Sequence, residues 1–392
     1  MRTYLHALGI INALGSGAQA VRTGLHTASL SRLVVRDDLV PGREVRVAAV
    51  NETLPDILPA LTAAYASRNN RLLQASVDQI RPQIDAAISR FGSGRVGIVL
   101  GTSTAGILEG EQAVRRRREQ GEFPRDFDYR QQEISSPSEY LKRAFGITGP
   151  AWTVSTACTS SAKAFAAARR LLHMNACDAV IVGGADSLCR LTLNGFTALE
   201  SVARQVCNPF SRNRDGITLG EGAAVFLLSR EPGPVCLLGV GESSDAYHIS
   251  GPDPEGRGAE IAMRAALTDA GVAAGEVDYL NLHGTGTLQN DLMESHAVAR
   301  VFGTDLSCSS TKPLVGNMLG AAGATELAFC WLLLTEHAAR THLPPHVWDG
   351  ERDPALAPLN LCGQDDPPRD CHIMASNSFA FGGSNTTLIV GT

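Results

Sequence analysis

The chain has 392 residues, of which 44% are hydrophobic, 5% are aromatic and 39 are glycine. This length suffices for a large core and predicts two domain-sized halves. The formal net charge of −6 is spread without long acidic or basic blocks, so it predicts neither nucleic-acid binding nor a membrane role. The apolar stretch "CWLLLTEHAA" is too short to span a bilayer.

The nine cysteines are scattered along the chain, and no C-x-x-C pair occurs. An odd, irregular set of this kind argues against a disulfide framework and against a structural zinc site. We therefore expect reduced thiols, a cytoplasmic location and no metal site. The N-terminal run "MRTYLHALGIINALGSG" is interrupted by glycines and lacks a clear cleavage site, so we expect no signal peptide.

Apolar runs and helical patterns alternate along the chain. The alternation predicts an α/β fold with mostly buried sheets. Strands are expected within 95–106, 178–186, 222–230, 235–247, 277–287 and 385–392. Helices are expected over 159–173, 258–271, 291–302 and 320–338.

The segment "EPGP" at 231–234 predicts a boundary between two unequal halves of similar build, 1–233 and 234–392, although no sequence repeat relates them. The stretch 107–148 is polar, arginine-rich and irregular, and we interpret it as an insertion or cap on the first half. Its "RRRR" run at 115–118 is either a solvated helix face or a docking patch for an acidic partner.

Cys158 lies where a strand-like run, "VSTAC", passes into a helical run, "TSSAKAFAAARRLL". The unpaired amides and the dipole at a helix N-terminus favour a thiolate, so we predict a lowered pKa for this thiol. A strand–nucleophile–helix turn also leaves amides free to bind an oxyanion. The alternative is a small buried side chain that fills space at a tight turn.

A second polar group follows a later strand. His283 precedes a G-T-G-T loop that contains Thr285 and Thr287, where glycines permit close approach of a ligand and the hydroxyls can bind it. A histidine after a strand is more often structural than catalytic. Glu326 lies in an otherwise apolar helix and needs a partner, for which Lys312 is the candidate. A buried structural salt bridge would explain that pair equally well.

Six motifs together resemble the elongating β-ketoacyl-carrier-protein synthases of the thiolase-like superfamily. They occur in the family's order from about residue 95 onward, and each would be weak alone. They are T-A-C-T-S-S at Cys158, "NPFSRNRDGITLGEGAAVFLL", "GESSDAYHISGPDPEGRG", H-G-T-G-T at His283, "STKPLVGNMLGAAGATE" and "NSFAFGGSN". The last of these places Phe381 in a turn that suits a movable gate.

The resemblance implies a five-layer αβαβα fold of two related halves, and a condensation between an acyl group on Cys158 and malonyl-carrier protein. The implied nucleophile is Cys158, with an oxyanion hole formed by the amides of Cys158 and Phe381. His283 would assist decarboxylation and stabilise the enolate, while Lys312 and Glu326 would organise the charge.

The resemblance also implies the substrate contacts and the partners. Thr285 and Thr287 would bind the pantetheine arm, Phe196 would face the gate, and Phe379 and Gly382 would belong to the substrate site. No metal or organic cofactor is implied, because the phosphopantetheine arrives on the carrier protein. The implied partners are acyl- and malonyl-loaded carrier protein, and a second subunit that is either identical or merely ketosynthase-like.

Two positions depart from the family pattern. Asn317 stands where elongating synthases carry a second histidine, and an asparagine can donate an N–H but cannot carry a positive charge. The chain could be a natural Cys-His-Asn enzyme, a variant that traps an intermediate, or an acyltransferase that condenses poorly. Ala380 replaces a glycine, which could stiffen the gate.

The short chain resembles ketosynthases of aryl-polyene or type II polyketide clusters, which often pair with a subunit lacking the cysteine. A chain-length-factor-like role is therefore a further alternative, which the presence of Cys158 and His283 disfavours.

Overall fold

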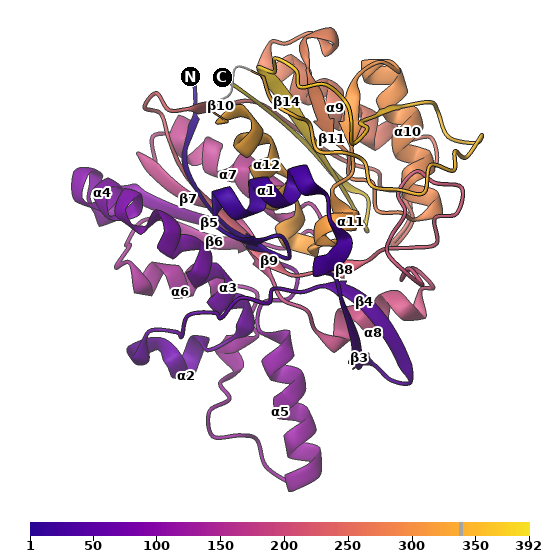
Figure 1. Ribbon diagram of the computed structural model, residues 1–392. Coiled ribbons are helices and arrows are strands. Elements are labelled where there is room, and N and C mark those ends of the chain that lie inside the picture. The colour runs from indigo at the N-terminus through magenta and orange to yellow at the C-terminus, as the bar shows by residue number, and fades with distance from the viewer. Residues whose placement is uncertain (337–339) are drawn as a thin grey trace.

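The computed structural model describes residues 1–336 and 340–392 (Figure 1). The first half is built on strands in the order β1-β9-β7-β5-β6. β1 pairs antiparallel with β9, β9 pairs antiparallel with β7, and β7, β5 and β6 are parallel. These strands are β1 Tyr4–Asn12, β5 Val96–Gly101, β6 Ala151–Val154, β7 Ala179–Asp186 and β9 Gly222–Ser229.

The second half repeats this pattern with strands in the order β10-β15-β14-β11-β12-β13. Its first two pairings are again antiparallel and the rest are parallel. The two halves therefore share one topology, which accounts for halves of similar build without a sequence repeat. Its strands are β10 Val235–Ser244, β11 Tyr279–Asn281, β12 Ser307–Ser309, β13 Asn360–Leu361, β14 Ile373–Ala380 and β15 Ser384–Gly391.

Helices complete a helix–sheet–helix–sheet–helix arrangement, in which the sheets of the two halves join where β1 pairs antiparallel with β10. α7 (Ser160–His173) and α12 (Ala322–Leu334) lie side by side in the middle of the molecule (Figure 1). They share the central core with side chains from both sheets. A Cβ on Gly323 of α12 would lie 2.7 Å from the Ala162 Cβ of α7, so the two helices approach closely. The outer helices are α3 Arg68–Val77, α4 Arg81–Phe91 and α6 Ser136–Ala144 on the first sheet, and α9 Arg257–Ala270 and α10 Leu288–Phe302 on the second.

Smaller elements surround this frame. A separate sheet contains β3 (Val34–Val40), β4 (Arg43–Ala48) and β8 (Leu219–Gly220), while β2 (Gly15–Ser16) pairs with β1. The further helices are α1 Ala18–Thr27, α2 Thr62–Tyr65, α5 Ile107–Gln120, α8 Arg190–Ala198 and α11 Lys312–Val315. Within the described residues, no helix is long and apolar enough to cross a membrane. All nine cysteines are free.

Three sequence expectations need correction. The stretch 107–148 is irregular only in part, because α5 and α6 flank the irregular segment 121–135, and α5 projects from the body of the molecule (Figure 1). The helix expected over 291–302 begins at Leu288, because the Thr287 side chain caps it by accepting a hydrogen bond from the Asn290 amide. The helix expected over 320–338 ends at Leu334 as α12, and positions 337 and 338 lie outside the described residues.

Candidate functional site

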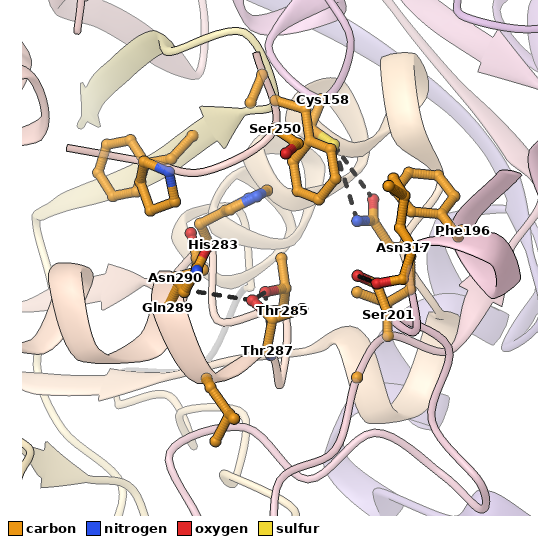
Figure 2. Close-up of a pocket in the computed structure, with 18 of the residues that line it drawn as sticks. Cys158, Phe196, Ser201, Ser250, His283, Thr285, Thr287, Gln289, Asn290 and Asn317 are labelled. Atoms are coloured by element: carbon orange, nitrogen blue, oxygen red, sulfur yellow. Dashed lines mark hydrogen bonds between the residues drawn. The ribbon is translucent and has the colours of Figure 1, made fainter. Parts of the chain in front are cut away.

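A cavity of about 330 Å³ is lined by residues of both halves (Figure 2). Of the predicted site residues, Lys312 and Glu326 are buried outside the cavity lining, and Gly382 lies in the turn after Phe381. The fold brings the other predicted residues together at the cavity wall: Cys158, Phe196, His283, Thr285, Thr287, Asn317, Phe379 and Phe381.

Cys158 lies in the tight turn between β6 and α7. The preceding residue, Ala157, has a φ of +52°, a left-handed conformation that turns the chain sharply at the cysteine. The Cys158 Sγ lies 3.8 Å from both amide atoms of Asn317. Because the Leu319 N–H donates to the Asn317 Oδ1 at 3.0 Å, the Asn317 Nδ2 is the amide atom left to donate toward the sulfur.

The predicted lowering of the Cys158 pKa is wrong. Burial raises the pKa of this thiol to about 11, against the opposing effects of the Lys312 charge and the Asn317 hydrogen bond. The amides that begin the turn and the helix point elsewhere: the Thr159 N–H donates to the Thr156 carbonyl and the Ser160 N–H to the Ala157 carbonyl. Desolvation therefore outweighs the attraction of the helix N-terminus.

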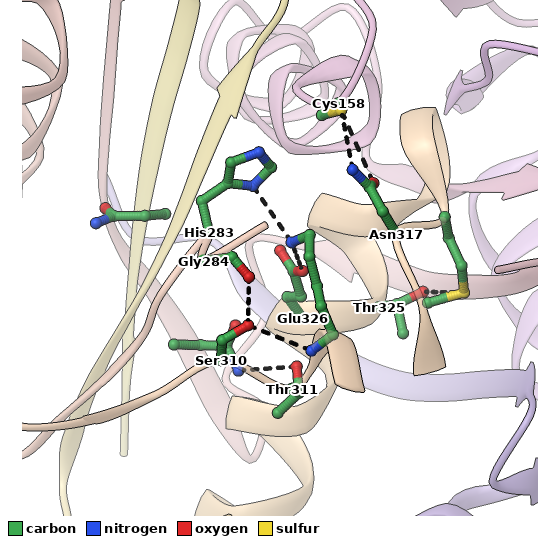
Figure 3. Close-up of polar contacts among 12 residues, drawn as sticks. Cys158, His283, Gly284, Ser310, Thr311, Asn317, Thr325 and Glu326 are labelled. Atoms are coloured by element: carbon green, nitrogen blue, oxygen red, sulfur yellow. Dashed lines mark hydrogen bonds and ion pairs between the residues drawn. The ribbon is translucent and has the colours of Figure 1, made fainter. Parts of the chain in front are cut away.

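His283 is held in place through its backbone and its ring. The Glu294 carboxylate accepts hydrogen bonds from the His283 and Gly284 amides, each at 2.7 Å. The His283 Nδ1 lies 3.3 Å from the Lys312 Nζ. An ammonium group can only donate, so Nδ1 is the acceptor and the neutral ring carries its proton on Nε2. This second nitrogen faces the side of Cys158 (Figure 3).

The charges behind His283 favour its neutral form. Burial and then the Lys312 charge hold the pKa of His283 well below its usual value. Lys312 and Glu326 form an ion pair with both side chains almost fully buried, as the apolar surroundings of Glu326 predict. Burial raises the pKa of Glu326, whereas Lys312 acts in the opposite direction. The arrangement supplies an imidazole N–H donor rather than an imidazolium.

Two buried acids that support the site were missed in the sequence. Burial raises the pKa of Glu294 to about 7, against the opposing effect of the hydrogen bonds that its carboxylate accepts from two backbone amides. Asp291 accepts hydrogen bonds from the amides of Phe210 and Gly286 and so fixes the G-T-G-T loop. Their signal was available, because two acids three residues apart share one face of α10 directly after that loop.

The predicted gate residues meet on the side of the cavity near Cys158 and Asn317 (Figure 2). The rings of Phe196, from α8, and Phe381 pack edge to face with centroids 5.5 Å apart. Gly382, with a φ of +87°, makes the turn that carries Phe381. Ala380 ends β14 without a positive φ, so its alanine imposes no backbone strain there. The Phe379 ring lies against the His283 ring, with centroids 6.0 Å apart.

The two threonines lie together beneath His283 in the cavity wall. Their hydroxyl oxygens are 3.0 Å apart (Figure 2). Thr287 also caps α10, so its position is fixed by the helix start. Thr285 does not cap the helix, and it lines the cavity.

Two family descriptions cover most of the chain. Residues 69–232 match the N-terminal domain of the β-ketoacyl synthases, and residues 235–345 match their C-terminal domain. The chain belongs to the β-ketoacyl synthase family. Its fold is thiolase-like, as the motifs predicted.

Relatives of known name agree with this membership. The chain is 36% identical over 263 residues to 3-oxoacyl-[acyl-carrier-protein] synthase 2 of Rhizobium meliloti (strain 1021), and the matched part spans 62% of this chain and 61% of that protein. It is 35% identical over 306 residues to nodulation protein E of Rhizobium meliloti, and the matched part spans 75% of this chain and 75% of that protein.

A solved structure matches the whole chain. It is a chain from the complex of the ketosynthase ApeO with its chain length factor ApeC from Xenorhabdus doucetiae. The similarity reaches 46% identity and a TM-score of 0.95, covering 100% of this chain and 98% of that chain.

Proposed function

We propose that this β-ketoacyl synthase joins an acyl group carried on Cys158 to a two-carbon unit from malonyl-carrier protein. The observation that carries the proposal is the convergence of Cys158, His283 and Asn317 on one cavity, with Lys312 directing the proton of His283 toward it. Each of these groups has a defined task in the two half-reactions.

The first half-reaction loads the enzyme. The Cys158 sulfur attacks the thioester carbonyl of an acyl-carrier protein, the bond to the pantetheine sulfur breaks, and the thiol proton of Cys158 passes to that departing sulfur. The backbone amides of Cys158 and Phe381 are proposed to stabilise the oxyanion, a contribution of about 10²–10³ in rate for a typical donor. Because burial raises the pKa of the thiol to about 11, proton loss accompanies the attack rather than preceding it.

The second half-reaction forms the carbon–carbon bond. Malonyl-carrier protein loses CO2, and the electron pair becomes an enolate whose oxygen accepts hydrogen bonds from His283 Nε2 and Asn317 Nδ2. The enolate carbon attacks the acyl carbonyl on Cys158, and the Cys158 thiolate leaves and takes a proton from water. The product is a β-ketoacyl-carrier chain two carbons longer.

The proposed function also assigns the residues that bind substrate, the source of the phosphopantetheine and the cellular location. Thr285 and Thr287 would bind the pantetheine arm, and Phe196 with Phe381 would admit the acyl chain. No resident cofactor is proposed, since the phosphopantetheine belongs to the carrier protein. We place the enzyme in the cytoplasm, because all nine cysteines are free thiols.

A second ketosynthase-like subunit is proposed as a partner. The support is the likeness to a chain from the complex of ApeO with its chain length factor ApeC. Cys158 and His283 assign the catalytic role to this chain, because partner subunits of that kind usually lack the cysteine. This chain would then be the catalytic member of the pair.

The acyltransferase alternative rests on Asn317, which cannot carry a proton as a histidine could.

The test is product formation by the purified chain, alone and with a co-expressed partner subunit. Acyl- and malonyl-loaded carrier proteins are supplied, and the carrier is analysed by mass spectrometry. A carrier protein that bears a β-ketoacyl chain two carbons longer than the acyl donor should form with the wild type. Its absence with Cys158→Ala supports the proposal. An acylated enzyme that leaves malonyl-carrier protein intact under both conditions would identify an acyltransferase instead.

A further inference from the structure

The helix that carries Phe196 begins without a cap of its own. Among the described residues around the start of α8, the side chain of Cys189, at the N-cap position, makes no capping bond, and the first turn contains no acid. The amides at a helix N-terminus need partners, and the helix dipole favours a negative charge there. A side chain that caps α8 must therefore come from outside this helix start.

Glu111 of α5 supplies it. One carboxylate oxygen of Glu111 accepts a hydrogen bond from the Arg190 amide at 3.0 Å, and the other accepts from the Leu191 amide at 2.6 Å. The neighbouring acid Glu109 accepts one further amide at the start of α3, from Arg68 at 2.8 Å, beside the Ser67 side chain that caps that helix. The base of α5 therefore holds the N-termini of two helices.

α8 connects this cap to the reacting sulfur. Leu193 is fully buried in an apolar cluster that also contains Cys158 and Ala380. One turn further along, Phe196 packs edge to face against Phe381. A shift or fraying of α8 would therefore displace Phe196 from Phe381 in the part of the cavity that lies next to Cys158.

α5 itself is tightly seated at this base. A Cβ on Gly110, between the two acids, would lie 1.9 Å from the Gln132 Oε1, so the helix lies close against the following segment. Beyond this point α5 projects away from the body (Figure 1). The carboxylate of Glu111 thus comes from a firmly packed part of the helix.

We propose that Glu111 is a positioning residue for the acyl gate: it caps α8 and thereby fixes Phe196 against Phe381. The inference rests on the proposed function only in assigning acyl selection to that aromatic pair. The cap and its effect on access to Cys158 can be measured without condensation.

The experiment compares Glu111→Ala with Glu119→Ala, a matched control that removes an exposed acid from the same helix. The first readout is hydrogen exchange of a peptide covering α8. We expect exchange in the first turn of α8 to rise about fivefold in Glu111→Ala, the scale of losing a helix cap, and to stay unchanged in the control. The conservative Glu111→Gln variant keeps one acceptor oxygen and should lie between them.

The second readout is access to Cys158. Alkylation by N-octylmaleimide and by N-ethylmaleimide is followed on the Cys158 peptide, and the ratio of the two rates reports the gate. We expect this ratio to change about fivefold in Glu111→Ala, again the scale of a lost cap, and not in Glu119→Ala.

A double variant keeps the proposal falsifiable. In a Phe196→Ala background, Glu111→Ala should leave the alkylation ratio unchanged, because the residue through which it acts is already gone. An equal effect in both backgrounds, or unchanged exchange and ratio in the single variant, would overturn the proposal. Failure of the condensation assay would leave these readouts intact, so the two results are distinguishable.

Discussion

Replacing Lys312 by methionine tests the most specific electrostatic claim about the site. Methionine keeps much of the length and apolar character of the lysine chain but cannot donate to the His283 Nδ1, which now receives the lysine hydrogen bond at 3.3 Å. A hydrogen bond to a charged group contributes about 1.5–3 kcal/mol. This hydrogen bond favours the tautomer with the proton on Nε2, which the proposed decarboxylation needs. Its loss should therefore lower the rate of malonyl-carrier decarboxylation by about 10- to 150-fold.

The same substitution changes the pH dependence in a defined direction. The Lys312 charge is one of the two causes that lower the pKa of His283, so its removal raises that pKa. The protonated ring then appears at a higher pH than in the wild type. The acid limb of the decarboxylation profile should therefore move to higher pH, while activity well above that limb stays limited by the lost tautomer.

Folding must be separated from catalysis, because Lys312→Met leaves Glu326 as a buried carboxylate without its cation. Breaking a buried pair in this way costs about 3–5 kcal/mol of stability, whereas replacing both partners costs much less. The double variant Lys312→Met/Glu326→Leu is therefore the main test, and Lys142→Met, on the outer helix α6, is the control. The role assigned to Lys312 would be refuted if the folded double variant released CO2 at the wild-type rate and the acid limb of its pH profile did not shift.

Three further predictions concern single residues. Alkylation of Cys158 by iodoacetamide should keep accelerating from pH 8 toward pH 11, since burial raises the thiol pKa to about 11, and a plateau near neutral pH would contradict that environment. Thr285→Val should raise the KM for malonyl-carrier protein by about 2- to 10-fold with little change in kcat, as for one neutral hydrogen bond, and an unchanged KM would remove Thr285 from the pantetheine contacts. Glu294→Gln should lower the free energy of unfolding by about 1–3 kcal/mol in urea titrations, because the amide nitrogen cannot accept the hydrogen bond of a backbone N–H, and equal stability would show that the clamp is dispensable.

Some strands were predictable because their buried runs are long and apolar, whereas strands such as β12 and β14 and the outer helices α3, α4 and α6 were not predicted. β7 and β9 are buried throughout, so their patterns stand out in the sequence. β1 was overlooked, although it lies between β9 and β10 at the junction of the two halves. Its glycines read as interruptions, yet Gly9 is needed because the Ser76 carbonyl oxygen lies 1.9 Å from where its Cβ would stand.

The side chains of the site were predictable where a motif named them, and their environment was not. Cys158 and His283 could be located from the sequence, but the thiol pKa depends on how much water the packed fold removes around it. Glu111 is the clearer case, since it is 79 positions from the Arg190 amide that it caps. Only the tertiary contact between α5 and α8 joins them.

The most direct test of the account is a single-turnover chase observed by intact mass. Cys158 is first acylated from acyl-carrier protein, excess donor is removed, and malonyl-carrier protein is added to the wild type and to His283→Ala. The account predicts that the acyl mass leaves the wild-type enzyme as β-ketoacyl-carrier protein appears, and that it persists on the His283 variant. An acyl mass that persists on the wild type, or that leaves both proteins at the same rate, would contradict the proposed condensation at Cys158, His283 and Asn317.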